Sequence, residues 1–301
     1  MRGIIFLLCL YCVQASGADW LNRTIRVDFV VDREVFHAFH DQNDFPRESP
    51  INDRRGINAT NGQFPWTIFT RARSPTQGAL CTGTIISDSY FLSDLRCLGQ
   101  QMIPPANSMG IYIGSNEVDW RDSPTNFVRH SWYIAPSAQN SPNIALCRID
   151  EPLTFNPNVQ PIRLPYTSNT NFSYEAWSSL LLGYELTANN NRFFDQLRSV
   201  PNKILHNDQC NFLGRIDEHE MCGLTDVTPY DNEFTPIRFS IFTGGAWMVN
   251  EYAADLNLHP VLIGIHHYQF FNGTEDTFGR ATRVSHFLEW ISTLTDGDTN
   301  K

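Results

Sequence analysis

The sequence predicts an all-β domain, a sandwich or barrel of antiparallel strands that ends in one helix. From about Gly56, short apolar runs recur with turn-forming residues between them, which is the pattern of antiparallel strands. Glycine occurs 18 times and proline 17 times, enough to supply many turns. The runs are Trp66–Thr70, Thr84–Ile86, Tyr90–Leu92, Met109–Ile113, Ile144–Ile149, Ser179–Leu182 and Val261–Ile265.

The first 17 residues have the organisation of a signal peptide. Arg2 supplies the positive start, Ile4–Val13 forms an apolar core too short to span a bilayer, and Ala15–Gly17 offers small residues for cleavage. We therefore expect a secreted, extracellular protein whose mature chain begins near Ala18.

We predict that residues 18–52 form an N-terminal preamble and that residues 53–301 form the main domain. In the preamble, charged residues alternate with single aromatic residues and no cysteine is present, so partial disorder and a strand on the main domain both remain open. The dibasic pair Arg54-Arg55 lies at the boundary and is either a cleavage site or a solvated turn.

The charge and composition exclude several function classes. The formal net charge is −10, so a phosphate backbone would be repelled and we expect no nucleic-acid partner. No later segment approaches the length of a membrane span, and no histidine, cysteine or acidic tract argues for a metal or another cofactor.

Sequons and cysteines agree with secretion. Four Asn-X-Ser/Thr sequons are candidate glycosylation sites, at Asn22, Asn58, Asn171 and Asn272. Five cysteines lie outside the signal peptide, an odd number that leaves at least one thiol without an intramolecular partner. Cys147 lies within the apolar run Ile144–Leu146 and is predicted to be that thiol, buried and inert.

The C-terminal segment predicts a helix. From Ser285 to Ile291, apolar residues recur at helical spacing, and Ser285 stands where a capping hydroxyl is expected.

Six stretches, in this order, resemble the chymotrypsin/trypsin family of serine proteases: Gly56–Trp66, Cys81–Cys97, Asn143–Leu146, Val159–Pro165, Thr243–Ala246 and Thr282–Ile291. The resemblance implies two six-stranded antiparallel β-barrels with a cleft between them and a C-terminal helix. It also implies two disulfides, Cys81–Cys97 and Cys210–Cys222.

At the catalytic positions, however, the chain departs from the family. The family uses a serine nucleophile, a histidine base and an aspartate that orients the histidine. By this resemblance the base position holds Arg96, the aspartate position Asn143 and the serine position Thr243. An arginine stays protonated and cannot accept the proton of a nucleophile, and triad loss costs on the order of 10⁶ in turnover.

The supporting positions are altered as well. The oxyanion-hole glycine is replaced by Ile241, the aspartate before the nucleophile by Phe242, and the base of the specificity pocket by Ile237. The residue that would supply the new N-terminus after zymogen cleavage is Asp53, so both members of the activation ion pair are missing together.

Three alternatives concern the histidines and the altered cleft. By the resemblance, His267 lies near the old triad and, with His266, could serve Thr243 as a base. A second hypothesis is a zinc site formed by His206, His266 and His267. We favour a structural role for these histidines over both hypotheses. Asp94 and Arg96 either form an ion pair that plugs the old site, which we favour, or leave Arg96 free for an acidic partner.

The resemblance predicts a secreted serine protease homologue, of an insect-like kind, that is not an enzyme and acts by binding proteins. Its expected partners are extracellular proteins, namely active proteases or their substrates, for which it would be a cofactor, decoy or scaffold in immune or reproductive fluid. The alternatives are a residual hydrolase or endopeptidase that depends on Thr243, and a structural or carrier protein.

Overall fold

A computed structural model describes residues 56–73, 78–98, 108–119, 122–129, 132–134, 143–166, 173–189, 192–225, 243–253, 256–271, 277–297 and 299. The signal peptide, the preamble and Arg54-Arg55 lie outside these residues. So do seven of the predicted site residues: Asp53, Ile237, Ile241, Phe242, Asn22, Asn171 and Asn272.

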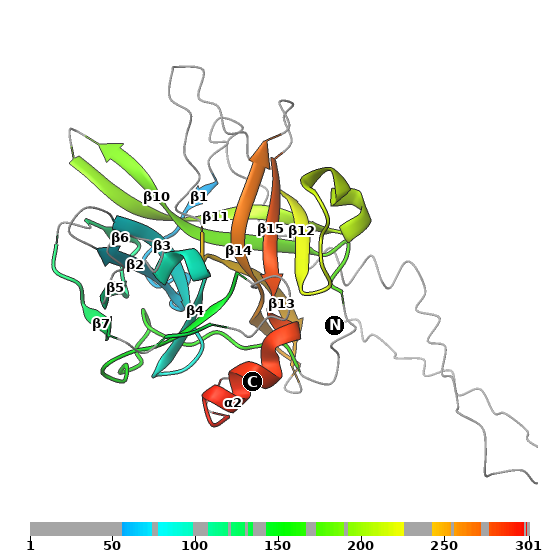
Figure 1. Cartoon of the computed structure of the whole chain (residues 1–301). Helices are drawn as coiled ribbons and strands as arrows, with labels where there is room; N and C mark the ends of the chain where they lie inside the picture. Colours follow the sequence, from blue (N-terminus) through cyan, green and yellow to red (C-terminus); the bar gives the residue numbers. More distant parts are fainter. Residues whose placement is uncertain are drawn as a thin grey trace, which may run out of the picture. The chain divides into compact units, whose positions relative to one another are not determined.

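The first half of the domain is a curled antiparallel sheet that forms a half-barrel (Figure 1). Its strand order is β7-β5-β2-β3-β4-β9-β8. The strands are β2 (Thr67–Arg73), β3 (Gly78–Ile85), β4 (Tyr90–Ser93), β5 (Ser108–Ile113), β7 (Asn126–Arg129), β8 (Trp132–Ile134) and β9 (Ala145–Arg148).

The second half is a closed antiparallel barrel, because β11 pairs with both β10 and β12 and so joins the two ends of the sheet. Two short strands, β1 (Ile57–Asn58) and β6 (Glu117–Val118), add to β11 from outside the barrel. The barrel strands are β10 (Ser178–Asn189), β11 (Arg192–Leu205), β12 (Glu220–Thr225), β13 (Ala246–Tyr252), β14 (Leu258–Phe271) and β15 (Thr277–Arg283).

Two apolar clusters hold the sheets together. The larger contains residues of both halves, among them the fully buried Ile68, Phe91 and Leu182. The smaller lies within the second barrel around Trp247. Since burying a large apolar side chain stabilises the fold by about 1.5–3 kcal/mol, the shared cluster fixes the two halves against each other.

The all-β prediction is confirmed, with one difference in detail: among the described residues, the first sheet is an open half-barrel instead of a closed barrel. The C-terminal helix is also confirmed, as a 3₁₀ turn η5 (Val284–Phe287) that leads into α2 (Leu288–Leu294). The predicted cap is wrong. Ser285 lies inside η5 and the cap position of α2 is Phe287, which makes no side-chain capping hydrogen bond.

Both implied disulfides are present, Cys81–Cys97 in the first half and Cys210–Cys222 in the second. Cys147, on β9, is a free thiol with no exposed surface, as predicted. Burial raises the pKa of this thiol far above its usual range, so it is not a nucleophile at physiological pH. No helix in the described part of the chain is long and apolar enough to cross a bilayer.

Candidate functional site

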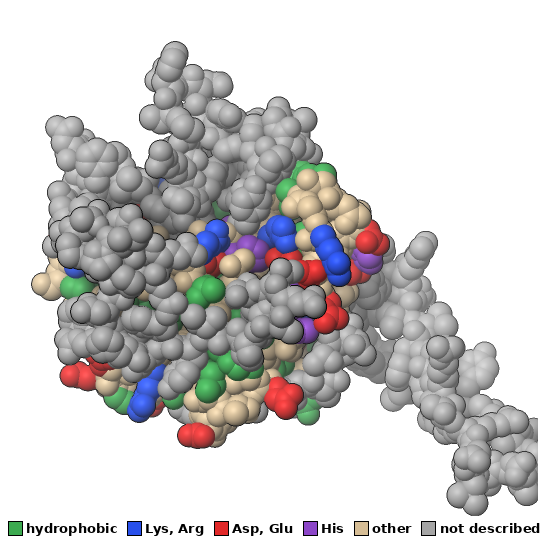
Figure 2. All heavy atoms as spheres, viewed as in Figure 1, with side chains coloured by type: hydrophobic (Ala, Val, Ile, Leu, Met, Phe, Trp, Pro, Cys, Tyr) green, Lys and Arg blue, Asp and Glu red, His purple; other side chains and the backbone are tan. Residues whose placement is uncertain are grey.

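The three predicted triad positions that the structure describes, Arg96, Asn143 and Thr243, lie where the two halves of the domain face each other. Asp94 directly follows β4, and Arg96 lies in the 3₁₀ turn η1 (Leu95–Leu98). The disulfide from Cys97 to Cys81 on β3 ties this turn to the first sheet. On the opposite side stands β14, and Figure 2 shows arginine, histidine and acidic side chains gathered in the middle of this face.

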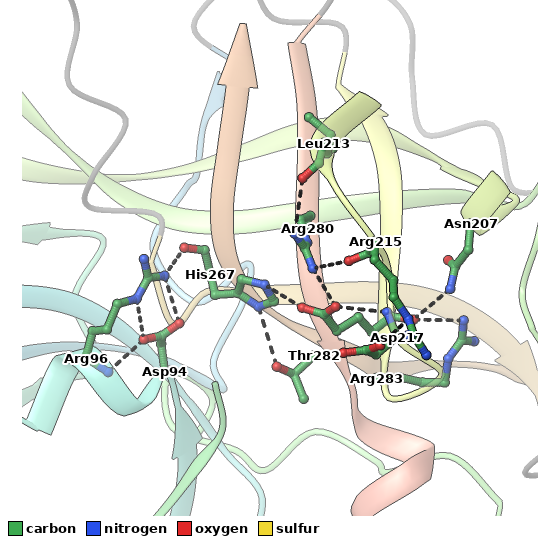
Figure 3. Close-up of polar contacts among 11 residues, drawn as sticks. Asp94, Arg96, Asn207, Leu213, Arg215, Asp217, His267, Arg280, Thr282 and Arg283 are labelled. Carbon is green, nitrogen blue, oxygen red and sulfur yellow. Dashed lines mark hydrogen bonds and ion pairs between the residues drawn. The ribbon is translucent and has the colours of Figure 1, made fainter. Parts of the chain in front are cut away.

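Asp94 and Arg96 form the predicted ion pair. The Asp94 side chain is 0% exposed and accepts from the Nε and Nη2 of Arg96, each at 2.9 Å, and from its backbone N–H at 2.7 Å. The Nη2 of Arg96 also donates to the backbone carbonyl of His267 on β14 (Figure 3). Arg96 therefore bridges the two halves, and its side chain remains 40% exposed.

Thr243 lies beside this pair and is held by its backbone. The N–H of Thr82 on β3 donates to the Thr243 carbonyl at 2.9 Å, and the Gly244 N–H donates to the His266 carbonyl at 2.7 Å. Gly244 has φ of +82°, and a Cβ there would lie 2.1 Å from the Thr82 carbonyl oxygen. This close approach requires glycine after Thr243 and packs the turn against Asp94.

Asn143 is placed near the same corner. It lies two positions before the first residue of β9, and this residue, Ala145, pairs with Ser93 at the end of β4. Asn143 is half-buried and its side chain is an uncharged amide. A carboxylate would be needed at this position to stabilise an imidazolium.

Both ring nitrogens of His267 contact residues of the second barrel. Its Nε2 lies 3.4 Å from the Oε1 of Glu220, and its Nδ1 lies 3.4 Å from the Oγ1 of Thr282 (Figure 3). The side chain is 4% exposed. Because both ring nitrogens already have partners, His267 has no nitrogen left to accept a proton from Thr243. For the same reason, the contacts of His267 are not those of a metal ligand.

Glu220, at the start of β12, organises the buried part of this network. Its carboxylate accepts from the Arg280 guanidinium and from the Asp217 N–H. Burial by itself would raise the pKa of Glu220, but hydrogen bonds from His267, the Asp217 backbone and Arg280 outweigh it and lower the pKa to about 2. Glu220 is therefore ionised at physiological pH and charge-balanced by Arg280.

His266 fills the barrel interior. The indole Nε1 of Trp247 donates to its Nδ1 at 3.2 Å, and the two rings stack with centroids 6.1 Å apart. Burial, with the nearby charges of His267 and Arg96, lowers the pKa of His266 to about 3. It is thus a neutral core residue, which agrees with the prediction that this histidine has a structural role.

One group of side chains has the spacing of a metal site. Ligand atoms of Asp217, His219 and Glu220 all lie within 4.8 Å of one another. Arg215 and Arg280 already pair with the two carboxylates, so a cation would meet two guanidinium groups there. The arrangement favours an ion-pair network over metal binding.

The sequence reasoning missed Glu220 and Arg280. They lie on β12 and β15, 60 positions apart, and meet because the register pairs Cys222 with Arg280 two residues from Glu220. No local motif marks such a pair. The available signal was one acidic residue on β12 and two arginines on β15, in strands that otherwise carry no charge.

Comparisons with known proteins agree with this fold. A family model described as Trypsin matches residues 53–233. The chymotrypsin of Phaedon cochleariae is 23% identical over 261 residues, which is 81% of this chain and 86% of that protein. Bovine coagulation factor XI is 25% identical over 162 residues, 52% of this chain, and the chain spans only 25% of its length.

A solved structure, HL collagenase, has the same fold. It superposes with a TM-score of 0.59 at 22% identity and covers 80% of this chain and 97% of the collagenase. At this identity the likeness establishes the fold alone. Together with the match over more than half of the sequence and the two disulfides in the expected places, it leads to one conclusion: this chain belongs to the trypsin family of serine proteases.

Proposed function

We propose that this chain is a secreted, non-catalytic member of the trypsin family that acts by binding other proteins. Arg96 carries the proposal, because it stands at the position of the catalytic base. Its guanidinium is held by the Asp94 carboxylate at 2.9 Å and by the His267 carbonyl. A guanidinium that stays protonated and is fixed in this way cannot remove a proton from a nucleophile.

The surrounding residues support the same reading. Asn143 is uncharged, although it stands at the position of the aspartate that orients the histidine. The hydroxyl of Thr243 is hindered by the methyl group on the same carbon. The nearest substitute base, His267, uses both ring nitrogens on Glu220 and Thr282. In the sequence, Ile241, Phe242, Ile237 and Asp53 replace the residues for the oxyanion, the activation ion pair and the pocket base.

The proposed setting is extracellular. Two disulfides in a small β domain are typical of an oxidising compartment. Asn58, the one sequon asparagine within the described residues, is exposed on β1 and thus accessible to a glycosyltransferase. We expect the cleft face to bind an active protease or a protease substrate, as a cofactor, decoy or scaffold.

Hydrolysis by the purified secreted protein tests the catalytic part of this proposal. A broad panel of peptides and esters is assayed before and after limited trypsin treatment, with a serine-reactive phosphonate as a covalent probe. We expect no turnover above the buffer rate and no labelling. Activity that Thr243→Ala abolishes would overturn the proposal and favour the Thr243-dependent hydrolase.

Affinity capture from the native fluid tests the binding part. The wild-type protein is compared with a variant carrying Arg96→Ala, and bound proteins are identified by mass spectrometry. Recovery of an extracellular protease or its substrate with the wild type alone supports the cleft as the binding face. Equal capture by both proteins would place binding elsewhere, and no specific capture favours a structural or carrier role.

A further inference from the structure

Two histidines lie side by side at the end of the second barrel that carries the C-terminal helix. His219 immediately precedes β12, and His286 lies in the turn η5 just before α2. Their ring centroids are 5.9 Å apart and their ring planes are tilted by 50°, so the rings are neighbours without being stacked face to face. The two residues are far apart in the sequence, which is why no short ligand motif marks them.

The ion-pair network of the second barrel uses neither imidazole. Among the residues that the structure describes, no hydrogen bond or ion pair involves a ring nitrogen of His219 or His286. His267, by contrast, uses both of its ring nitrogens on Glu220 and Thr282. Since a neutral imidazole has one nitrogen that accepts, each of the two rings keeps a lone pair that no described protein group occupies.

The fold holds both histidines in place. The backbone N–H of Arg283 donates to the His219 carbonyl at 2.8 Å, directly beside the last paired residues of β12 and β15. Phe287 packs edge-on against both rings, with its centroid 6.2 Å from that of His219 and 5.0 Å from that of His286. A ligand therefore meets two rings that are already close together, which lowers the entropy cost of binding.

The charges around the pair allow a cation to bind. His286 is exposed, so an ion reaches it from solvent. The guanidinium of the nearby Arg283 donates to two backbone carbonyls. Partial burial lowers the pKa of His286; the charge of Glu218 opposes this shift, and the charges of His219 and Arg283 add to it. The His286 ring is therefore neutral at physiological pH, which is the form that binds a metal ion.

We propose that His219 and His286 together bind one divalent transition-metal ion of the Zn²⁺ and Cu²⁺ class. Imidazole nitrogen is a preferred ligand of these ions, whereas Mg²⁺ and Ca²⁺ prefer oxygen. An imidazole nitrogen lies about 2.0–2.1 Å from Zn²⁺, so two imidazoles on one ion have ring centroids roughly 5–6 Å apart. The observed separation of 5.9 Å fits this arrangement, with water in the remaining positions. The ion ties the connection before β12 to the turn before α2.

Calorimetric titration of the whole secreted chain, first treated with a chelator, tests this proposal at pH 7.5. We expect one Zn²⁺ to bind per chain and Mg²⁺ to give no heat of binding. Mutation of a group that only orients a metal ligand typically costs about 10–100-fold in affinity, so loss of a ligand should cost at least as much. His219→Gln and His286→Gln should therefore each weaken Zn²⁺ binding by about tenfold or more.

A histidine outside the pair provides the matched control. His206 is half-exposed and has the carboxylates of Glu175 and Asp208 beside it, so it is the competing place for a single imidazole ligand. His206→Gln should keep the Zn²⁺ affinity of the wild type. Loss of binding in this variant would overturn the proposal and move the ion to His206.

Electron paramagnetic resonance of bound Cu²⁺ identifies the ligands directly. Nitrogen splitting from two imidazoles is expected in the wild type, and from one imidazole in either variant of the pair. His286→Gln replaces an exposed side chain, so it decides the question if His219→Gln does not fold. No Zn²⁺ binding by the wild type would contradict the proposal, and so would an unchanged affinity in His286→Gln.

Discussion

At the scale of single residues, the buried carboxylates of Asp94 and Glu220 are each matched by one arginine. Asp94 depends on Arg96, and Glu220 depends on Arg280. The exposures differ, since Arg96 is 40% exposed and Arg280 19%. Arg96 therefore has a structural role: it compensates a buried charge and joins the turn after β4 to β14, which belongs to the other half of the fold.

Loss of this compensation should destabilise the domain. We expect Arg96→Met to lower the free energy of unfolding by about 2–3 kcal/mol, below the ~3–5 kcal/mol of a fully buried pair because solvent screens the exposed guanidinium. Urea unfolding at pH 7 measures this. The double variant with Asp94→Asn should recover part of the loss, whereas additive effects would show that the two side chains are not coupled.

Glu220 gives the stability a specific dependence on acid pH. Its folded-state pKa of about 2 is below the usual value of 4.5 for glutamate, so the folded state binds this proton less readily than the unfolded state. The stabilisation is complete above pH 4.5 and is lost as pH falls toward 2. Unfolding measured from pH 2 to 6 should show a shallower slope in Glu220→Gln. An unchanged slope would assign the acid sensitivity to other groups.

At the scale of elements, the turn that begins at Thr243 packs closely against the first sheet just before β13. Its backbone bonds to Thr82 and His266 leave room for nothing larger than hydrogen on Gly244. The helix α2 is held differently. It lacks a side-chain cap and depends on the burial of Leu288 and Ile291, because tertiary packing stabilises a short helix more than its caps do.

Gly244→Ala should be severely destabilising. The new methyl group meets the Thr82 carbonyl at 2.1 Å as well as an unfavourable φ of +82°. Gly297→Ala is the matched control, with φ of +76° and nothing within 4 Å of the added Cβ. We expect a loss of about 1 kcal/mol for the control, from backbone strain alone, and several times more at Gly244. Similar melting temperatures for the two variants would contradict the packing of the turn.

At the scale of the whole molecule, a shared apolar core and several polar bridges make the two halves one cooperative unit. The larger apolar cluster draws residues from both sheets. The contacts of Arg96 with His267 and of Thr82 with Thr243 cross the same boundary. Because Cys147 is at the centre of this core, its exposure reports the opening of the first sheet.

A thiol reagent should therefore leave Cys147 of the mature native protein unmodified and react fully in denaturant. The reason is burial, which excludes the reagent and raises the pKa of the thiol. The labelling rate against urea concentration is the measurement, with Cys147→Ala as the blank. Rapid labelling of the native protein would mean that β9 opens without global unfolding.

The sequence by itself determined the class of fold, the two disulfides, the buried thiol and the ion pair of Asp94 with Arg96. These follow from local patterns or from pairs close along the chain, which strand periodicity and family motifs capture. The motifs also predict that Asn143 and Thr243 stand at altered catalytic positions. The cap of α2 was misplaced because helix ends depend on a few contacts that propensity does not encode.

Only the tertiary structure decided what surrounds those positions. Arg96 reaches the His267 carbonyl across 171 positions, and His267 turns both ring nitrogens to Glu220 and Thr282. Asp195 is left buried with no hydrogen bond to its carboxylate among the described residues. Each of these contacts depends on strand register, and register is fixed by packing across the whole barrel. A one-residue slip would send every one of these side chains to the other face, so no local reading of the sequence determines them.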